Sequence, residues 1–550
     1  MHKLSNILKH GLSSKHDEGV DTVNIDSRAQ FPSERDVFTL RKQRGVNLGS
    51  WFVLERWITD APFRHASEPG QSDLDVARGS QAKETLEHHW DTWITEQDFR
   101  WIAERGINTV RIPIGYYHVC GADPSVLQGT DFADRLSVYE GAWQRITNAI
   151  ATARRYGLGV LIDLHAAPGK QNRDAHSGTS SPNPGFFTKH NMSRTTHVLT
   201  VLLTHLSRFA QSQTPPLHNI VGIELLNEPQ PDDHNAALQK WYLDTGRVLR
   251  QVDSQIPIYI GDAWQTDQAT GFIESQAHTL PFMVLDHHLY RCFTQQDGNT
   301  PASQHAHNLR DLQADTPQMF ARVVQKLEAA GGALVVGEWS GALNPGSLHG
   351  VVNDIEVRRE YIAAQLALYE RHCAGYYFWT YKKEHGGDKG WSYRDAVDAG
   401  VFPSHVGIRT GQVNNDDGGD TNRTARMNEA KEKALNEHAG YWAKYPGKYE
   451  HWRFGDGFMW GWSDVWLFFT SATSISALAT VPEIGFKGVC AKRRGEEHQK
   501  EKGKSNLWEF GEHCPAADQQ TTRPAKSPWY PSFPQNTVIP RESAPHMSIW

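Results

Sequence analysis

Two glutamates stand at the ends of short apolar runs and are the first candidates for chemistry. The run 220–226, which is apolar except for Glu224, is followed by Asn227 and Glu228, and the run 333–337 is followed by Glu338. A short apolar run bounded by polar segments is typical of a buried strand, and a parallel β/α barrel carries its active site at the carboxyl ends of its strands. Two carboxyl groups placed there could hydrolyse a glycosidic bond with retention of configuration.

Each glutamate also has a plain structural interpretation. Pro229 could simply end a strand and leave Glu228 in solvent with no chemical role. A single strand end of this kind would leave the two interpretations evenly matched. The chain has two of them, one after an asparagine and one before a tryptophan, and this favours a catalytic pair over two solvated side chains.

Other polar and aromatic residues lie at or just past further predicted strand ends. Arg111 could be a buried ion-pair partner, and His165 and His288 could be hydrogen-bonded core histidines. Trp379 could be plain core or the floor beneath a sugar ring. Polar groups at several successive strand ends are costly to bury unless they bond to one another. We therefore expect one shared site that contains Glu55, Arg111, His165, Asn227, Glu228, His288, Tyr290, Glu338 and Trp379.

The two glutamates can be given separate roles. Retaining hydrolysis needs a nucleophile that stays ionised and an acid that later takes a proton from water. We assign Glu338 as the nucleophile, because Arg111 and Tyr290 could keep it ionised by charge and hydrogen bonding. We assign Glu228 as the acid/base. Asn227 could hydrogen-bond the sugar 2-hydroxyl, a contact that strengthens in the transition state.

The elements that must position these residues alternate along the chain. Apolar or β-branched runs are separated by helical patterns, such as the one that begins at the capping box Thr95–Asp98 and ends at Gly106. Eight strands alternating with helices predict an α/β fold, a (β/α)8 TIM barrel with long βα loops. The expected strands lie near residues 45, 110, 161, 223, 258, 285, 335 and 377.

The predicted barrel leaves a segment at each end of the chain. Residues 1–37 are polar and without pattern, and we expect a flexible arm. We assign 38–440 to the barrel, with a last barrel helix at 425–440. Residues 441–550 form an extension that is aromatic-rich at first and irregular at the end. We expect its residues 446–470 to pack on the barrel, because the nine aromatic side chains in that span would be costly to expose.

Composition and charge exclude several classes of function. The 550-residue chain has a net charge of −7, which argues against a nucleic-acid surface. Its five cysteines are odd in number and at no metal-binding spacing, so neither a disulfide framework nor a metal is implied, and no cofactor is implied either. We find no transmembrane segment and no secretory signal, and we expect an intracellular, cytoplasmic protein.

Seven motifs occur in the order found in a known family. They are Arg44-Gly-Val-Asn-Leu-Gly-Ser-Trp51, Arg111-Ile-Pro-Ile-Gly115, Asp163-Leu-His-Ala-Ala-Pro-Gly-Lys-Gln-Asn172, Leu226-Asn-Glu-Pro229, Asp286-His-His-Leu-Tyr290, Gly337-Glu-Trp-Ser340 and Phe378-Trp-Thr380. On these motifs, which span roughly residues 40–385, the chain resembles the fungal exo-β-1,3-glucanases of glycoside hydrolase family 5.

The resemblance implies a clan A barrel with the acid/base on the fourth strand and the nucleophile on the seventh, in agreement with the roles argued above. It implies Glu55, His165 and His288 as ligands of the terminal glucose, and Phe293 as an aromatic residue at the mouth of the cleft. In the secreted glucanases a Phe-Asp pair follows the Gln-Asn of the third loop, whereas Asp-Ala stands here at 174–175. Half of the family's aromatic clamp is then absent, which leaves the use of laminarin-type chains open.

These observations predict a retaining glycoside hydrolase that releases glucose from the non-reducing end of β-1,3-glucan or a related β-glucoside by double displacement. An intracellular hydrolase of steryl glucoside or glucosylceramide is the alternative among enzymes, because some intracellular relatives in the family cleave these lipids. A non-catalytic glucan-binding protein is the alternative of another class. Binding alone does not need both carboxyl groups, so the intact pair favours the enzyme.

Overall fold

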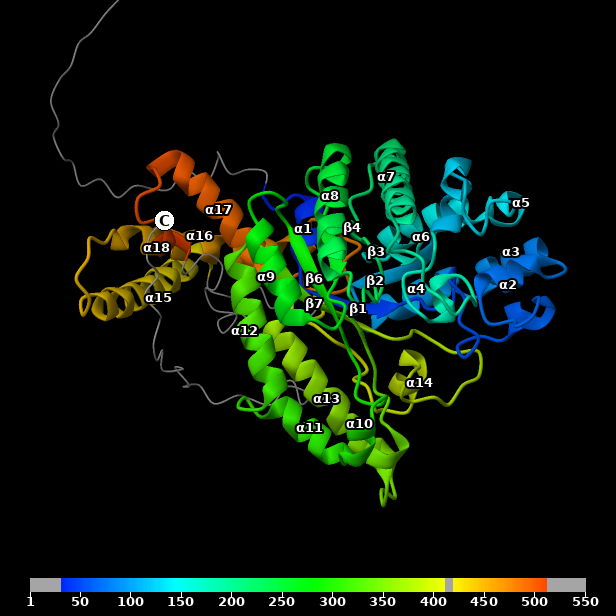
Figure 1. Cartoon of the computed structure of the whole chain (residues 1–550). Coiled ribbons are helices and arrows are strands. Elements are labelled where there is room, and N and C mark those ends of the chain that lie inside the picture. The colour runs from blue at the N-terminus through cyan, green and yellow to red at the C-terminus, as the bar shows by residue number, and fades with distance from the viewer. Residues whose placement is uncertain (1–30, 411–418, 512–550) are drawn as a thin grey trace, which may run out of the picture.

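The predicted barrel is confirmed by a computed structural model, which describes residues 31–410 and 419–511. Eight parallel strands close a barrel in the order of the sequence, with helices outside them (Figure 1). The strands are β1 (Gln43–Asn47), β2 (Thr109–Gly115), β3 (Gly159–Ala166), β4 (Ile220–Glu224), β5 (Ile258–Gly261), β6 (Met283–Leu289), β7 (Ala333–Trp339) and β8 (Gly375–Phe378).

The outer layer consists of helices that follow the strands. The predicted capping box of Thr95 and Asp98 starts α4, and Gly106 follows that helix with a φ of 80°. The longer helices of this layer are α3 (Ala82–Thr92), α4 (Glu96–Glu104), α6 (Ala142–Arg155), α7 (Lys189–Ser212), α8 (Asn235–Val252), α9 (Thr266–Gln276), α12 (Asp315–Ala329) and α13 (Asp354–His372). Shorter ones are α2 (Asp73–Arg78), α5 (Leu136–Tyr139), α10 (Gln295–Asn299), α11 (Ala302–Arg310) and α14 (Tyr393–Asp398), whereas α1 (Glu34–Leu40) precedes β1.

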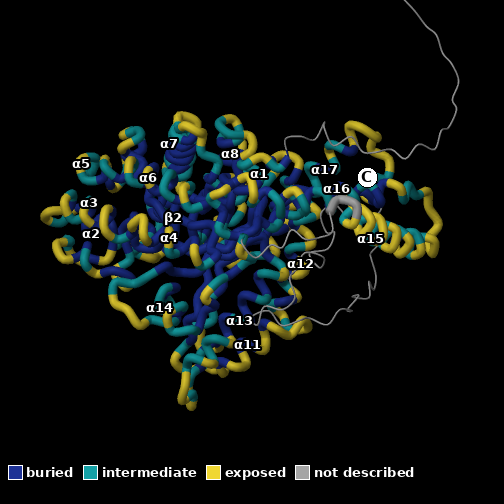
Figure 2. Tube along the Cα trace, turned by 180° about the vertical axis from the view of Figure 1, so that it is seen from behind, coloured by how far each residue is buried: buried dark blue, intermediate teal, exposed yellow. Residues whose placement is uncertain are grey.

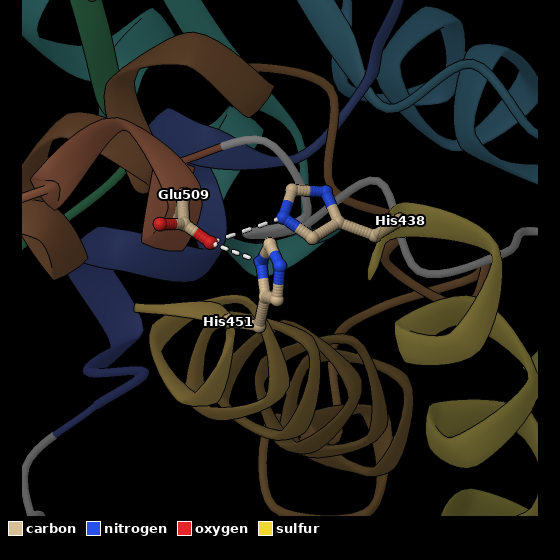
Figure 3. A group of neighbouring side chains, drawn as sticks. All are labelled: His438, His451 and Glu509. Carbon is tan, nitrogen blue, oxygen red and sulfur yellow. Dashed lines mark hydrogen bonds and ion pairs between the residues drawn. The ribbon is translucent and has the colours of Figure 1, made fainter. Parts of the chain in front are cut away.

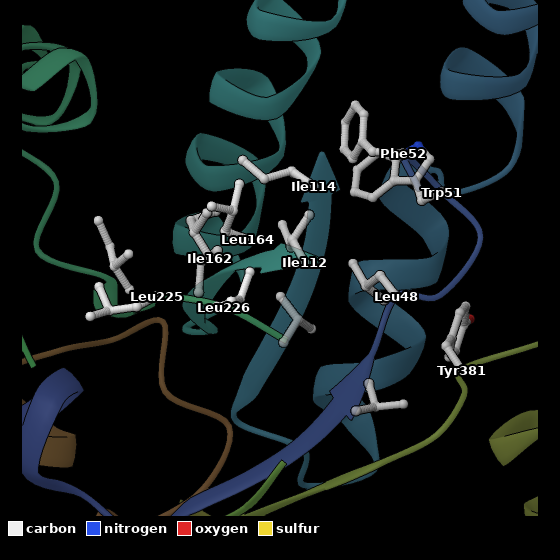
Figure 4. Packing of buried hydrophobic residues seen from close by; sticks show 14 of the residues in the cluster. Leu48, Trp51, Phe52, Ile112, Ile114, Ile162, Leu164, Leu225, Leu226 and Tyr381 are labelled. Carbon is white, nitrogen blue, oxygen red and sulfur yellow. The ribbon is translucent and has the colours of Figure 1, made fainter. Parts of the chain in front are cut away.

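The core lies between the strands and this helical layer. Figure 2 shows the central strands buried and the outer faces of the helices exposed. Ile112 and Ile114 of β2 pack with Leu164 of β3 in the core between the strands and the helices (Figure 4). Side chains alternate across a strand, so Arg111, next to Ile112, belongs to the opposite face and the barrel interior. The strands thus combine an apolar outer face with polar residues inside.

The carboxyl ends of the strands depart from regular pairing. The register shifts between Ile114 and Gly115 where β2 pairs with β3, and between His287 and His288 where β6 pairs with β7. A further shift affects the end of β7 beside β8. Such irregularities change the direction of the side chains that follow them. They occur at the end of the barrel where the candidate site residues lie.

The C-terminal extension forms a group of helices on one side of the barrel (Figure 1). It contains α15 (Gly419–Trp442), α16 (His451–Thr470), α17 (Lys487–Lys502) and α18 (Leu507–Gly511). We expected residues 425–440 to be the last barrel helix, but α15 packs against α16 in this group instead. The periodic pattern of a helix does not reveal which neighbour it packs on, and here that neighbour follows it in the chain.

The extension packs on the barrel, as predicted, and closes its amino-terminal end. An apolar cluster there, the basal plug, joins residues from three parts of the chain. The strands contribute Leu161, Val221, Tyr259, Val284, Val335 and Tyr377, helix α1 and the residues near it contribute Phe31, Val37, Phe38 and Leu40, and the extension contributes Phe468, Ile475, Leu478, Ile484, Phe486 and Cys490. Within 446–470, the segment that we expected to cover the barrel, Val465 and Phe468 reach the plug, and 475–490 supplies the rest.

Within residues 31–410 and 419–511, none of the helices combines the length and apolar character that a membrane span requires.

Candidate active site

Glu228 and Glu338 lie together at the carboxyl end of the barrel. Glu338 is in β7, and Glu228 follows β4 by four residues. One carboxylate oxygen of each glutamate and a ring nitrogen of His288 all lie within 4.8 Å of one another. A retaining glycosidase needs its two carboxyl groups about 5 Å apart, whereas an inverting enzyme leaves room for a water between them. The separation therefore fits retention.

Glu338 is held at both of its oxygens. Arg111 Nη1 donates to Oε1 at 3.1 Å, and the Tyr290 hydroxyl donates to Oε2 at 2.8 Å. The residue before it is Gly337, whose N–H donates to Asp286 Oδ1 at 2.6 Å. A Cβ at Gly337 would lie 2.0 Å from Asp286 Oδ2, so only glycine fits there. The sequence thus fixes both the orientation and the backbone position of this carboxylate.

Arg111 is the centre of a buried charge network. Its Nε donates to Glu224 at 2.8 Å, and its Nη2 donates to Asn227 at 2.9 Å and lies 3.1 Å from Asp163 Oδ2. Asn47 of β1 accepts a further bond from Nη1 at 3.0 Å. Burial would lower the pKa of Arg111, but the surrounding carboxylates outweigh it and raise that pKa well above its ordinary value. The guanidinium therefore stays charged and joins several strand ends.

Glu228 sits in an unusual backbone conformation and has one side-chain partner. Its φ is 42°, in the left-handed region that residues other than glycine seldom adopt. The N–H of Asn227 donates to Leu164 O at 3.1 Å, and the side chain of Asn172 donates to Glu228 O at 3.1 Å. His288 Nδ1 lies 2.7 Å from Glu228 Oε1. Strain of this kind is common where a catalytic side chain must point in a set direction.

The pKa values of the two carboxyls are linked. Burial raises the pKa of Glu338 to about 7, with the charge of Glu228 adding to the rise and His288 and Arg111 opposing it. Burial also acts to raise the pKa of Glu228, but the hydrogen bond and charge of His288 outweigh it, and that pKa is lowered. The charges of Glu338 and Asp286 overcome burial at His288 and raise its pKa well above the ordinary value. Near neutral pH the pair of Glu228 and Glu338 therefore gains or loses a single proton.

A stacked group of rings forms another wall of the site. The ring of His165 lies parallel to that of Trp379, with centroids 5.7 Å apart and an interplanar angle of 4°. His165 Nδ1 lies 2.6 Å from Asp163 Oδ2, and its Nε2 lies 3.0 Å from His176 Nδ1. The hydrogen bonds with Asp163 and His176 orient the imidazole, and the indole next to it offers a flat apolar face.

Glu55 and several aromatic side chains lie at the mouth of the site. Burial raises the pKa of Glu55 to about 7, and Trp57 Nε1 donates to its carboxylate at 2.7 Å. The Trp57 ring packs against Trp391, which in turn contacts Tyr290 and Phe293. Phe293 is 70% exposed and Trp57 is 43% exposed. These rings give the entrance an open apolar surface.

The structure thus brings together every residue that the sequence placed at the site, and it adds others that the sequence analysis missed. Two of the added residues had a signal in the sequence: Asp163 and Asp286 each stand two positions before a predicted histidine, and positions two apart in a strand share a face. Loop residues such as His176 had no such signal. The residues missed are Asn47, Trp57, Asp163, His176, Glu224, Asp286 and Trp391.

Two groups of side chains inside the site have the composition of a metal site. They are Glu224, Asp286 and His288, and the group of Glu228, His288 and Glu338. Arg111 already bonds to Glu224 and Glu338, and His288 already bonds to Glu228. The charges of these carboxylates are therefore compensated by cationic side chains of the chain itself.

Comparison with known families identifies the barrel. Residues 76–385, more than half of the chain, match the model of the cellulase family, glycosyl hydrolase family 5. The chain belongs to this family. Residues 423–521 match a second model, the C-terminal domain of glucan 1,3-beta-glucosidase 3, which begins within α15. The expected membership is thus confirmed, and the protein is a retaining glycosidase with a helical extension.

The relatives of this chain include named fungal enzymes. Glucan 1,3-beta-glucosidase 3 of Schizosaccharomyces pombe is 30% identical over 446 residues, which cover 79% of this chain and 87% of that protein. A probable glucan 1,3-beta-glucosidase A of Aspergillus fumigatus is 32% identical over 66% of this chain and 87% of its own length. Among solved structures, a rutinosidase from Aspergillus niger covers 66% of this chain and 98% of its own, with 19% identity and a TM-score of 0.50, and shares the fold.

Proposed function

We propose that this enzyme releases glucose from the non-reducing end of β-1,3-glucan or a related β-glucoside. The observation that carries the proposal is the pair of carboxyl groups of Glu228 and Glu338, which have one oxygen each within 4.8 Å of the other. The names of some relatives support the substrate class, because the Schizosaccharomyces pombe and Aspergillus fumigatus proteins, which align along most of their length, are named as a glucan 1,3-beta-glucosidase and a probable one. Hydrolysis then proceeds through a covalent glucosyl-enzyme in two displacements.

Glu338 is the nucleophile in this proposal. Its two oxygens accept bonds from Arg111 and Tyr290, so the carboxylate is fixed in direction, and both partners oppose the rise in its pKa that burial causes. A nucleophile held in this way attacks the anomeric carbon without first losing freedom of motion. The glycosyl-enzyme forms as the bond to the leaving oxygen breaks.

Glu228 is the acid/base. Its side chain is 16% exposed, against 7% for Glu338, which suits a group that exchanges protons with a leaving group and with water. In the substrate-free site the pKa directions favour the proton on Glu338, the reverse of what the first step needs. We infer that a bound sugar takes over the bond of His288, which frees Glu228 to accept the proton from Glu338.

The remaining site residues bind the terminal glucose. Asn227 is oriented by Arg111 and can bond the 2-hydroxyl, and Trp379 offers its face beneath the ring. Glu55, His165 and His288 supply polar contacts to the other hydroxyl groups. Phe293 and the neighbouring rings lie where the rest of the substrate leaves the site.

A lipid glucoside is a second candidate substrate, favoured by the apolar entrance. Trp57, Phe293 and Trp391 form a connected aromatic surface there, and two of them are largely exposed. Such a surface could receive a sterol or a ceramide as well as the face of a second sugar. The chemistry at Glu228 and Glu338 would be the same for both substrates.

A direct comparison of substrates tests the proposal. Purified protein would be assayed on laminaritriose, on laminaritriose reduced at its free end, on gentiobiose and on steryl glucoside. We expect stepwise release of glucose from both forms of laminaritriose, because attack begins at the non-reducing end. Turnover of the steryl glucoside alone would select the second candidate, and turnover of none of these substrates would refute both.

A further inference from the structure

The C-terminal extension contains a group of metal-ligating side chains far from the barrel interior. His438 of α15, His451 at the start of α16 and Glu509 of α18 converge there (Figure 3). His438 Nε2 lies 3.1 Å from Glu509 Oε2, and His451 Nδ1 lies 2.8 Å from the same oxygen. One ligand atom of each residue lies within 4.8 Å of the other two. Three helices therefore present two imidazole nitrogens and a carboxylate oxygen to one point.

Burial makes this group unusual. The side chain of Glu509 is fully buried and that of His438 is 4% exposed. Glu509 Oε1 accepts the backbone N–H of Glu450 at 2.6 Å, which fixes the plane of the carboxylate. In the described part of the chain no arginine or lysine is paired with Glu509. A buried carboxylate needs a compensating positive charge. A cation bound between Glu509 and the two histidines would supply that charge.

The rings of both histidines are held in place by aromatic neighbours. His438 stacks on Phe454 with centroids 4.1 Å apart, and His451 stacks on Tyr449 at 5.3 Å and 10°. The ring nitrogens that face Glu509 are thereby fixed in direction. Metal sites are commonly oriented in this way by the residues around the ligands.

We propose that His438, His451 and Glu509 bind a zinc-class divalent metal ion. Two imidazole nitrogens and one carboxylate oxygen are a donor set that zinc accepts, with water in a fourth position. His451 is 31% exposed and gives the ion and this water a path from solvent. The nitrogen-to-oxygen distances are a few tenths of an ångström shorter than the edge of a zinc tetrahedron, about 3.3 Å. Binding then requires a small separation of the three side chains, with loss of the protons between them.

Such an ion would fasten the extension rather than take part in hydrolysis. The three ligands come from α15, α16 and α18, so one ion links the first and last helices of the group. Phe468 at the other end of α16 belongs to the basal plug. The expected effect of the metal is therefore on the stability of the extension, with hydrolysis at the opposite end of the barrel unchanged.

The test is a titration of the full-length protein after removal of metals by dialysis against a chelator. Addition of Co²⁺ is expected to give visible absorption bands that saturate near one equivalent and are displaced by Zn²⁺. Zn²⁺ is expected to raise the melting temperature by several degrees and to leave the hydrolysis of an aryl β-glucoside unchanged. His451→Ala and Glu509→Gln should each abolish the bands and the shift, and His278→Ala, which removes an exposed imidazole elsewhere, should keep both.

Two results would overturn the proposal. If the wild-type protein binds neither ion at micromolar concentration, the three residues are a hydrogen-bonded group only; this result does not depend on any variant folding. If both folded variants bind Co²⁺ as the wild type does, the ion sits elsewhere.

Discussion

The two ends of the barrel are built from the same strands but from opposite kinds of residue. At the carboxyl end, β3 presents Asp163 and His165 to a network around Arg111. At the amino end, the same strand contributes Leu161 to the basal plug. One end is polar, strained at Glu228 and partly open to solvent, and the other is apolar and covered by the N-terminal helix and the extension.

The difference shows how one fold separates function from stability. The carboxyl end of the barrel holds several carboxylates that would repel one another without Arg111, so its arrangement costs free energy that burial elsewhere must offset. The plug supplies such burial with aromatic and aliphatic side chains. Substitutions at the two ends should therefore have separable effects on turnover and on unfolding.

The largest effect is expected from Arg111→Met, which would break the polar end. Glu224, Asp163 and Glu338 would lose their shared cation, and kcat/KM should fall at least ~10³-fold. The free energy of unfolding should also drop by about 3–5 kcal/mol, because buried charges are left unpaired. Denaturant unfolding and aryl β-glucoside kinetics measure both. Arg322→Met, which removes an exposed ion pair, is the control and should change stability by about 1 kcal/mol or less.

Phe486→Ala would break the apolar end alone. The side chain is fully buried in the basal plug, so its loss leaves a cavity and should cost about 3–5 kcal/mol of unfolding free energy. The values of kcat and KM at a temperature where the variant is folded should equal those of the wild type. Leu467→Ala, at a partly exposed position of the same extension, should stay within about 0.5 kcal/mol. A large loss of kcat in folded Phe486→Ala would show that the two ends are coupled.

The pH profile of kcat/KM sharpens the account of the polar end. Activity needs one proton on the pair, so it should fall on the alkaline side as the proton with a pKa of about 7 is lost. On the acid side it should persist below the ordinary glutamate pKa of about 4.3, because the pKa of Glu228 is lowered. Each pH value requires a control for unfolding by return to pH 6 before assay. An acid limb near pH 6 would contradict the assigned proton balance.

The smallest effect is expected from Phe293→Ala at the entrance. The side chain is 70% exposed, so stability should change by about 0.5 kcal/mol or less. KM for a trisaccharide or a lipid glucoside should rise several-fold because the aromatic contact is lost, whereas an aryl glucoside that ends near the catalytic pair should be affected less. Equal changes in KM for short and long substrates would show that Phe293 does not contact the part of the substrate outside the catalytic pair.

The sequence predicts the strands and the residues at their carboxyl ends far better than it predicts the contacts of the loops and of the C-terminal helices. Eight apolar runs with polar ends lead to the barrel, and the two-residue period leads to Arg111 and His165. His176 comes from a loop and α15 has several surfaces that it could pack on, and no local pattern settles such long-range choices. Most of the arm expected at 1–37 lies outside the described residues, α1 begins before the boundary expected at 37, and α15 spans the boundary expected at 440. The cytoplasmic location and the catalytic roles stay predictions.

The central claim is the division of roles between Glu228 and Glu338, and azide rescue tests it most directly. In Glu228→Gln an activated aryl β-glucoside should still form the glycosyl-enzyme, because its leaving group hardly needs a proton. The intermediate should accumulate and give a burst. Azide needs no general base, so it should restore turnover and yield the β-glucosyl azide.

Glu338→Gln should lose the covalent route and hydrolyse no β-glucoside, and azide could at most give the α-glucosyl azide by direct attack. The measurement is the anomeric configuration of the azide product of each variant. The account predicts the β product from Glu228→Gln. The α product from that variant, with a burst and the β product from Glu338→Gln, would exchange the two roles, as the pKa directions of the substrate-free site would favour.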